Sequence, residues 1–227
     1  MKLTKKTRKI IWWILFIGIS LPLLWLLYNW LLAVDEGLRW GLFYPLGVHD
    51  LTANPIEFTN RFLGDWALRF LLFSLAITPL ARIFKFNQII AYRRMIGLWA
   101  FTYVSIHLTS YIVLDQFFDW AAIWRDILKR NYITFGMTAF ALLVPMAVTS
   151  TKGWIKRLGS KAWKKLHRVV YVIAPLAAFH FLLMSKGNQL EPKVYIGIVV
   201  LLLGIRVWFY LKDKQKTATR KAAVLNS

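Results

Sequence analysis

Hydrophobic positions are gathered into long blocks along this chain. Six apolar runs stand out, and they cover residues 10–34, 66–81, 95–114, 132–149, 169–184 and 194–211. A helix needs about 20 apolar residues to cross the hydrocarbon core of a bilayer, with about 17–25 usual. The first and third runs meet this length directly, whereas the second and fifth are short, and Arg69 and Arg206 interrupt the second and sixth. The pattern predicts an all-α integral membrane protein.

Basic residues are segregated between alternate loops, and this supports the weaker spans. The stretches 1–9, 82–94, 150–168 and 212–227 hold 21 of the 30 Lys and Arg, while the other loops hold nine of the ten acidic residues. Lys and Arg that flank membrane helices stay in the cytoplasm. We therefore expect six crossings with both termini cytoplasmic. The net charge of +20 then reflects membrane topology and not a nucleic-acid surface.

The chain is predicted to form one six-helix bundle over residues 1–212, followed by a basic cytoplasmic tail over 213–227 that we expect to be disordered. The first run is too long for a cleaved signal peptide and should remain as a helix. An interfacial helix is expected within NPIEFTNRFLGDW (54–66). Four spans contain a proline (Pro22, Pro79, Pro145 and Pro175), which a membrane tolerates when neighbours satisfy the freed carbonyls.

Several kinds of chemistry are excluded by composition and motif. The chain has no cysteine, which excludes disulfides, Fe–S ligation and thiol chemistry. It carries neither a Gly-rich phosphate loop nor a dinucleotide fingerprint, so we expect no soluble NADH domain. The many Trp and Tyr residues at the ends of the runs are typical of interfacial belts.

Two histidines are predicted to share one depth in the membrane. The third and fifth runs both cross from the cytoplasm outward, and His107 follows Arg94 by 13 residues just as His180 follows His167. At 1.5 Å per residue, each interval rises about 19 Å. His107 and His180 should therefore lie at one level near the outer face, and His167 should lie near Arg93 and Arg94 at the inner face.

Facing imidazoles at one depth, on different helices of a bundle, are typical of a bis-histidine site for haem iron. Ligation uses the nitrogen lone pair, and the other ring N–H can seek a carbonyl or a hydroxyl, such as those of Thr109 and Ser110. The alternative is that His107 and His180 are interhelical hydrogen-bonding groups. Ionisable residues within a membrane are functional candidates by default, which favours ligation.

The inner-face residues leave more than one interpretation open. His167 is either an interfacial basic residue or a contributor to a second, inner cofactor site. On an ideal helix it would lie about 140° from His180, so either Pro175 bends the helix or His167 faces a different partner. Arg93 and Arg94 either follow from the positive-inside bias or bind haem propionates or a flavin phosphate.

The remaining intramembrane or loop candidates have simpler expected roles. Arg206 is expected to extend toward the cytoplasm along its aliphatic stem. Arg69 is expected to reach the outer headgroups or outer propionates. We expect His49, in the loop YPLGVHDLT, to be solvated.

The motifs around these residues resemble a known family. In order along the chain, ITPLAR (77–82), RRMIGLWAFTYVSIHLTSY (93–111) and LGSKAWKKLHRVVYVIAPLAAFH (158–180) are similar to the MsrQ family. This is the haem-binding membrane subunit of the bacterial methionine sulfoxide reductase system, within the ferric-reductase-like transmembrane superfamily. The similarity covers about residues 54–210, with a core at 54–185. Members of the wider ferric-reductase and NADPH-oxidase superfamily typically carry histidine pairs on both ligand helices. Here Arg93 and Arg94 occupy the inner position on the third span, so an inner haem lacks an obvious ligand.

The resemblance implies b-type haem, bound flavin mononucleotide (FMN) and a location in the bacterial inner membrane. It also implies that electrons come from the quinone pool or a cytosolic flavin reductase. They would pass to a periplasmic molybdopterin-containing methionine sulfoxide reductase that repairs oxidised proteins. On this hypothesis the chain is an electron-transfer subunit without its own substrate chemistry, with His107 and His180 as axial ligands.

Two other functions are alternatives to this hypothesis. One is a transmembrane reductase that acts directly on ferric iron or another small acceptor. Such proteins usually carry a fused flavin domain, and we expect the 16 residues 212–227 to leave no room for one. The other is a non-redox transporter that uses histidines as a proton relay. Acidic residues inside the spans would favour the transporter, and the six predicted runs contain none.

Overall fold

The computed structural model describes residues 3–34, 51–52, 54–185 and 189–225, which are almost entirely helical and include no strand. The elements in chain order are α1 (Lys5–Val34), α3 (Pro55–Ile83), the 3₁₀ helix η2 (Asn87–Tyr92), α4 (Arg93–Ser110), the π-helical turn η3 (Tyr111–Asp115), α5 (Trp120–Lys129), α6 (Asn131–Val148), α7 (Lys152–His167), α8 (Val170–Met184) and α9 (Leu190–Leu225). Among these described residues, six helical segments are long and apolar enough to cross a membrane. The prediction of an all-α fold with six spans is confirmed.

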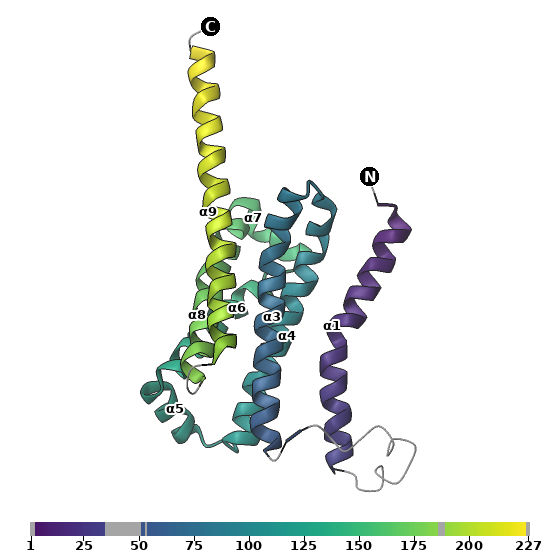
Figure 1. Ribbon diagram of the computed structural model, residues 1–227, viewed down its shortest axis with the longest axis vertical. Coiled ribbons are helices and arrows are strands. Elements are labelled where there is room, and N and C mark those ends of the chain that lie inside the picture. Colours follow the sequence, from purple (N-terminus) through teal and green to yellow (C-terminus); the bar gives the residue numbers. More distant parts are fainter. Residues whose placement is uncertain (1–2, 35–50, 53, 186–188, 226–227) are drawn as a thin grey trace.

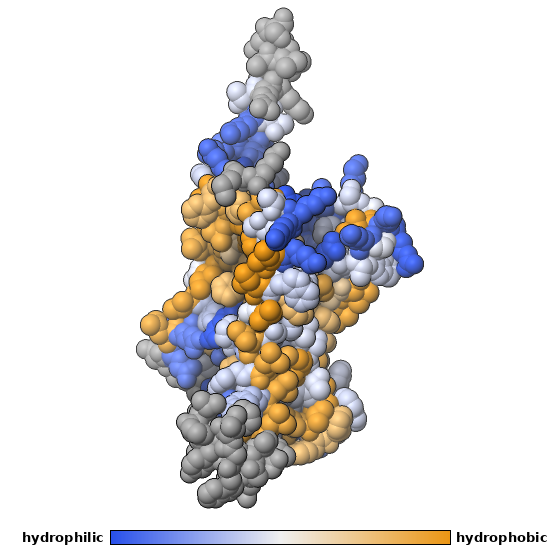
Figure 2. Space-filling model, turned by 90° about the vertical axis from the view of Figure 1, so that its right-hand side faces the viewer, coloured by the Kyte–Doolittle hydropathy of each residue, from blue (hydrophilic) through white to orange (hydrophobic). Residues whose placement is uncertain are grey.

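The spans run alternately up and down, so both ends of the chain lie at one end of the bundle (Figure 1). We call this the basic end; it contains the start of α1, the η2 turn, α7 and the last turns of α9. The far end contains α5 and the first turns of α3, α6 and α9. Hydrophilic residues gather mainly near the basic end, beside a broad apolar surface (Figure 2). This separation is what the alternating loop charges predict, although the side of the membrane on which each end lies stays a prediction.

The core lies between α3 and the helices around it. Buried side chains of α3, including Leu63, Leu71 and Leu75, pack with Tyr103 of α4 and Ile173 of α8. The outward faces carry large apolar side chains in the open, as lipid-facing helices do. Along the bundle, α3 packs against α4 and α6 packs against α8. These two helix pairs supply the site described below.

Near two of the prolines, polar side chains from neighbouring helices form hydrogen bonds with backbone groups of the proline-containing helix. Pro79 has no N–H to offer the Leu75 carbonyl, and Arg206 of α9 donates to that oxygen from Nη2 at 2.5 Å. Close to Pro22, the Tyr103 hydroxyl donates to the Ile19 carbonyl at 2.8 Å and accepts from the Leu23 N–H at 3.0 Å. The Arg206 guanidinium therefore lies within the bundle and bonds to the freed carbonyl, while its expected extension toward the cytoplasm stays a prediction.

Three predicted segments differ in the structure. NPIEFTNRFLGDW is no separate interfacial helix: Asn54 caps α3 by accepting from the Glu57 N–H, and the helix continues from Pro55 into the bundle. The basic stretch 152–167 is helical and bends at Gly159, whose φ is +74°. The C-terminal tail is not disordered, because α9 continues to Leu225. Local helix propensity extends these helices past the apolar runs that identified them.

Two consequences concern the far end. An amphipathic helix does occur there, but it is α5, which exposes Trp120, Trp124 and Leu128 in one stripe. The expectation that the spans lack acidic residues is also wrong, because α3 begins early enough to include Asp65. Asp65 lies within electrostatic range of Arg69 and Glu191, so this carboxyl belongs to a mixed-charge cluster between α3 and α9.

Candidate functional site

The structure brings His107 and His180 together near the far end of the bundle. Their ring centroids lie 6.3 Å apart, and the ring planes are inclined by 76°. His107 comes from the last turn of α4 and His180 from near the end of α8. The common depth predicted from the two 13-residue intervals is thus present in the packed structure.

Hydrogen bonds fix which nitrogen of each ring carries the proton. His107 Nδ1 lies 2.8 Å from the Asn60 carbonyl oxygen, and His180 Nδ1 lies 2.6 Å from that of Tyr132. A carbonyl only accepts, so both Nδ1 atoms must donate and both Nε2 atoms keep their lone pairs. Within the described part of the chain, neither Nε2 takes part in a hydrogen bond. Both imidazoles are therefore in the tautomer that metal ligation requires.

Carbonyls and not the hydroxyls of Thr109 and Ser110 accept from the imidazole N–H groups. The single hydroxyl hydrogen of Ser110 is shared between the Asn60 side-chain oxygen, 2.5 Å from Oγ, and the His107 carbonyl oxygen, 2.9 Å from Oγ. Thr109 Oγ1 bonds instead to the Ser105 carbonyl. Asn60 thus accepts from His107 through its backbone and from Ser110 through its side chain, which ties α3 to the end of α4.

The spacing of the two rings fits a single iron. With centroids 6.3 Å apart, the two rings are close enough that both would hold one metal ion through Nε2. The described residues contain no group of three or more His, Cys, Asp or Glu that could hold a metal ion. Two histidines alone are too few for a typical protein-only site, but they suffice for haem, whose macrocycle supplies the other iron ligands. The donor set therefore fits haem better than a bare metal ion.

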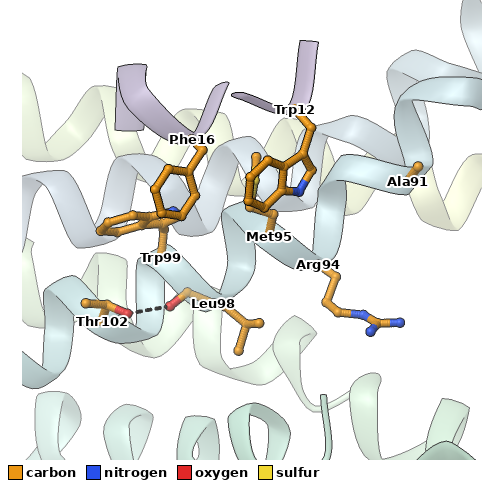
Figure 3. A pocket seen from close by; sticks show the side chains of 8 residues that line it. All are labelled: Trp12, Phe16, Ala91, Arg94, Met95, Leu98, Trp99 and Thr102. Carbon is orange, nitrogen blue, oxygen red and sulfur yellow. Dashed lines mark hydrogen bonds between the residues drawn. The ribbon is translucent and has the colours of Figure 1, made fainter. Parts of the chain in front are cut away.

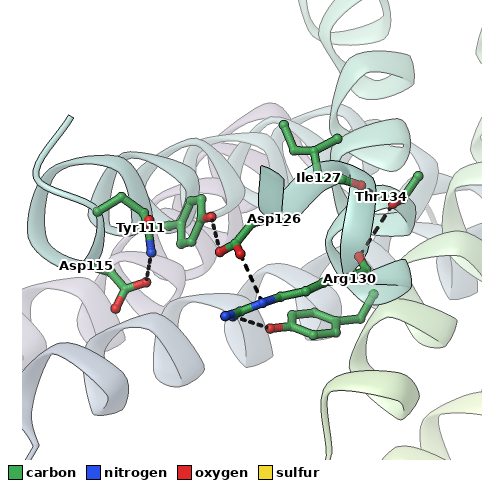
Figure 4. A network of polar contacts seen from close by, with 8 residues as sticks. Tyr111, Asp115, Asp126, Ile127, Arg130 and Thr134 are labelled. Carbon is green, nitrogen blue, oxygen red and sulfur yellow. Dashed lines mark hydrogen bonds and ion pairs between the residues drawn. The ribbon is translucent and has the colours of Figure 1, made fainter. Parts of the chain in front are cut away.

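A polar network at the far end connects the surroundings of both histidines. Tyr111, one turn after His107, donates to Asp126 Oδ2 at 3.0 Å, and Arg130 Nε lies 3.0 Å from Asp126 Oδ1 (Figure 4). Arg130 Nη1 also donates to the Tyr132 hydroxyl at 3.1 Å, and the Tyr132 carbonyl accepts from His180. We call Tyr111, Asp126, Arg130 and Tyr132 the far-end network. Sequence reasoning missed it; the amphipathic pattern of residues 120–129 was the available signal.

His167 lies at the basic end and faces a partner of its own. Its Nε2 is 3.2 Å from Thr149 Oγ1, and its ring stacks on Trp163 with centroids 3.9 Å apart. His167 ends α7, and a turn separates it from α8, so the second of the two predicted alternatives holds. Arg93 and Arg94 lie within electrostatic range of His167, in agreement with the predicted inner level.

Comparison with known proteins decides the family. The family described as "Ferric reductase like transmembrane component" matches residues 63–178. A relative from Rhodospirillum rubrum named "Protein-methionine-sulfoxide reductase heme-binding subunit MsrQ" is 56% identical over 158 residues, which are 70% of this chain and 76% of the relative. The relative of the same name from Caulobacter vibrioides is 48% identical over 173 residues, which are 76% and 80% of the two chains. The chain belongs to the MsrQ family.

Membership of the MsrQ family agrees with the fold: the chain is a multi-pass membrane protein of ferric-reductase-like type. The matched region begins at Leu63 in α3 and ends within α8. It contains His107 and His167, and His180 follows two residues after its end.

A groove of about 560 Å³ lies between α1 and α4 on the basic-end half of this MsrQ family member (Figure 3). Its wall is aromatic, with Trp12 stacked on Phe16 and Phe16 edge-on to Trp99. Arg94 borders the groove, whereas Arg93 turns the other way and donates to Thr78 Oγ1 at 3.4 Å. The two consecutive arginines therefore contact different neighbours, although both lie within electrostatic range of His167.

Two further predicted candidates stand apart from the histidine pair. Arg69 Nε donates to the Tyr195 hydroxyl at 2.8 Å, and its Nη2 lies 3.3 Å from Glu191, so Arg69 joins α3 to α9. These contacts occupy the guanidinium that was expected to reach the headgroups or propionates. His49 lies outside the described residues.

Proposed function

We propose that this MsrQ family member is a membrane cytochrome b that transfers electrons across the bacterial inner membrane to a periplasmic methionine sulfoxide reductase. The observation that carries the proposal is the facing pair of His107 and His180, each with Nδ1 bonded to a carbonyl and Nε2 left to ligate. The name of the relatives, heme-binding subunit of a protein-methionine-sulfoxide reductase, supports the same conclusion.

The chain's own residues act by holding and tuning the iron ligands. Donation from each Nδ1–H to a carbonyl fixes the ring orientation and raises the basicity of Nε2. His107 and His180 would hold a b-type haem through their Nε2 atoms, and a haem held by two histidines would supply one-electron transfer and not oxygen activation. The substrate chemistry then belongs to the partner, a molybdopterin-containing reductase of oxidised proteins.

Sidedness supports this direction of transfer. Positive loops stay in the cytoplasm, which would place the basic end inside and the histidine pair near the periplasm. A periplasmic acceptor would meet the pair at that face. The aromatic groove beside Arg94 lies between lipid-facing helices on the inner half, which suits a quinol from the membrane pool as donor. The alternative donor, a cytosolic flavin reductase, would approach the basic end.

A second, anionic group is proposed at the inner level. Arg93 lies within electrostatic range of both His167 and Arg206, so at least three basic groups converge there. Such a cluster suits the phosphate of FMN or the propionates of a second haem. We assign Arg93, Arg94 and His167 to this group. Extraction of the cofactors from the purified protein decides between these two groups. Release of FMN together with one haem per chain favours FMN, and release of two haems per chain without FMN favours a second haem.

The visible spectrum after dithionite reduction tests the axial pair. We expect sharp b-type bands in the parent protein and in His49→Ala, and their loss in His107→Ala and His180→Ala. His167→Ala should slow reduction from the inner side or lose part of the haem. Bands that survive in both His107→Ala and His180→Ala would remove the assignment.

The acceptor is tested separately in right-side-out membrane vesicles, whose outer surface is the periplasmic face. With quinol as donor, methionine sulfoxide reduction by added periplasmic reductase should require this chain and its His107–His180 pair. Equal rates with ferric chelates and without the reductase would favour direct reduction of small acceptors instead.

A further inference from the structure

Each imidazole of the pair lies flat against a glycine of the neighbouring helix. Gly64 of α3 faces His107: a Cβ built at this glycine would lie 3.3 Å from Cε1 and 3.4 Å from Nδ1. Gly136 of α6 faces His180, where a Cβ would lie 2.8 Å from Nδ1 and 3.0 Å from Cε1. Neither ring could keep its present position against an alanine without a shift, and His180 has less room than His107.

Each glycine lies at the same interval along its helix from the residue whose carbonyl accepts the imidazole hydrogen bond. Gly64 follows Asn60 by four residues, and Gly136 follows Tyr132 by four. In an α-helix a side chain leans toward the N-terminus and covers the turn before its own Cα. The side chain four residues later therefore lies over the carbonyl oxygen. A glycine there leaves the oxygen open to a donor from another helix.

We propose that Gly64 and Gly136 are positioning residues that uncover the Asn60 and Tyr132 carbonyls so that each ligand imidazole donates from Nδ1 and presents Nε2. This inference rests on the proposed haem function and assigns no contact with substrate. It explains why two glycines, which weaken helix interiors, stand in the middle of regular turns of α3 and α6.

The same protein offers matched controls. Gly97 of α4 is a packing glycine, whose Cβ would lie 3.3 Å from Ser74 Oγ of α3, as close as the contact at Gly64 but away from the histidines. Gly204 of α9 has open space, with nothing within 4 Å of its Cβ. Gly97→Ala reports the cost of crowding α3 against α4, and Gly204→Ala reports the cost of a glycine change alone.

The experiment compares Gly64→Ala, Gly136→Ala, Gly97→Ala and Gly204→Ala in the full-length protein purified in detergent. Haem dissociation, the midpoint potential and the low-spin electron paramagnetic resonance spectrum are measured, with thermal unfolding alongside. Gly136→Ala should weaken haem binding about 10–100-fold, as loss of a second-shell hydrogen bond does, and Gly64→Ala should do so less. Both should raise the potential, because a ring that no longer donates from Nδ1 is a weaker base and stabilises ferric iron less.

The outcomes separate this inference from the proposed function. If the parent binds haem through His107 and His180 while Gly64→Ala and Gly136→Ala match Gly97→Ala in potential and resonance spectrum, the positioning role is wrong and the haem assignment stands. If the parent binds no haem, the proposed function itself fails. Should Gly136→Ala fail to fold, Gly64→Ala still decides, because its milder contact is sterically matched by Gly97→Ala.

Discussion

Replacing Asp126 by asparagine should loosen the histidine pair while leaving the bundle folded. Asp126 is the centre of the far-end network: it accepts from Tyr111, which follows His107 by one turn, and pairs with Arg130. Arg130 reaches Tyr132, whose carbonyl holds His180. The network is thus a short polar connection between α4 and α6 at the level of the pair.

The magnitude follows from the exposure of the Arg130 and Asp126 side chains. Arg130 is 53% exposed and Asp126 16% exposed, and an exposed i,i+4 ion pair contributes about 0.3–0.5 kcal/mol. A hydrogen bond to a charged group contributes about 1.5–3 kcal/mol when sheltered, whereas hydrogen bonds between membrane helices average about 0.6 kcal/mol. We therefore expect a coupling of about 1 kcal/mol between Tyr111 and Asp126, which exceeds the coupling between Asp126 and Arg130.

A double-mutant cycle measures this coupling. The variants are Tyr111→Phe, Asp126→Asn and the combination, with the free energy of unfolding taken from titration of detergent-solubilised protein with sodium dodecyl sulfate. Haem dissociation is followed in the same four proteins and should accelerate about five-fold if the lost 1 kcal/mol acts on the pair. Asp115→Asn is the matched control, because Asp115 lies on the same surface and, within the described residues, its carboxylate accepts a hydrogen bond from its neighbour Gln116 alone.

Two results would refute the reasoning. A coupling near zero would mean that the Tyr111–Asp126 contact adds nothing beyond solvation. A clear coupling in unfolding with unchanged haem dissociation would mean that the network stabilises the far end without acting on the histidines.

Two further predictions concern the basic end. Arg206→Met should destabilise the fold by about 1–3 kcal/mol, because the Leu75 carbonyl loses its donor. The loss should be smaller in a Pro79→Ala background, where residue 79 regains an N–H that can bond to this carbonyl. Equal losses of stability in both backgrounds, measured by thermal unfolding, would contradict this explanation. Thr149→Val removes the hydroxyl beside His167 Nε2 and should change the content or the reduction rate of the inner cofactor. The b-type bands of the His107–His180 pair should stay unaltered. Changed bands in the reduced spectrum would contradict the separation of the two sites.

The sequence predicted the features that depend on depth alone. Apolar length and alternating charge gave the number of spans, and an interval of 13 residues gave the level of His107 and His180. Depth is a one-dimensional property set by helical rise, so it can be counted along the chain. That two rings at one level actually face each other depends also on rotation about each axis, which the packing of α3 on α4 and α6 on α8 supplies.

The sequence failed where contacts join helices that are distant in the chain. Arg206 meets the Leu75 carbonyl across 131 positions, and no local pattern connects them. The far-end network joins residues on both sides of α5, and the amphipathic pattern of that segment indicates a helix but not its polar partners. Helix ends were also misplaced, as at Pro55 and Leu225, because polar residues extend a helix as readily as apolar ones once it leaves hydrocarbon.

Backbone carbonyls explain where the polar contacts of the bundle lie. A donor side chain inside hydrocarbon meets no water and must find an acceptor in protein, and helical carbonyls are the most abundant ones. Most of them are covered by the side chain one turn later. Gly64 and Gly136 remove that cover, and Pro79 removes the competing N–H; imidazole and guanidinium groups from neighbouring helices occupy these three openings. In this bundle, therefore, the helix-weakening residues decide which backbone oxygens accept from a neighbouring helix, and on our proposal His107 and His180 can ligate haem because each stands opposite such an oxygen.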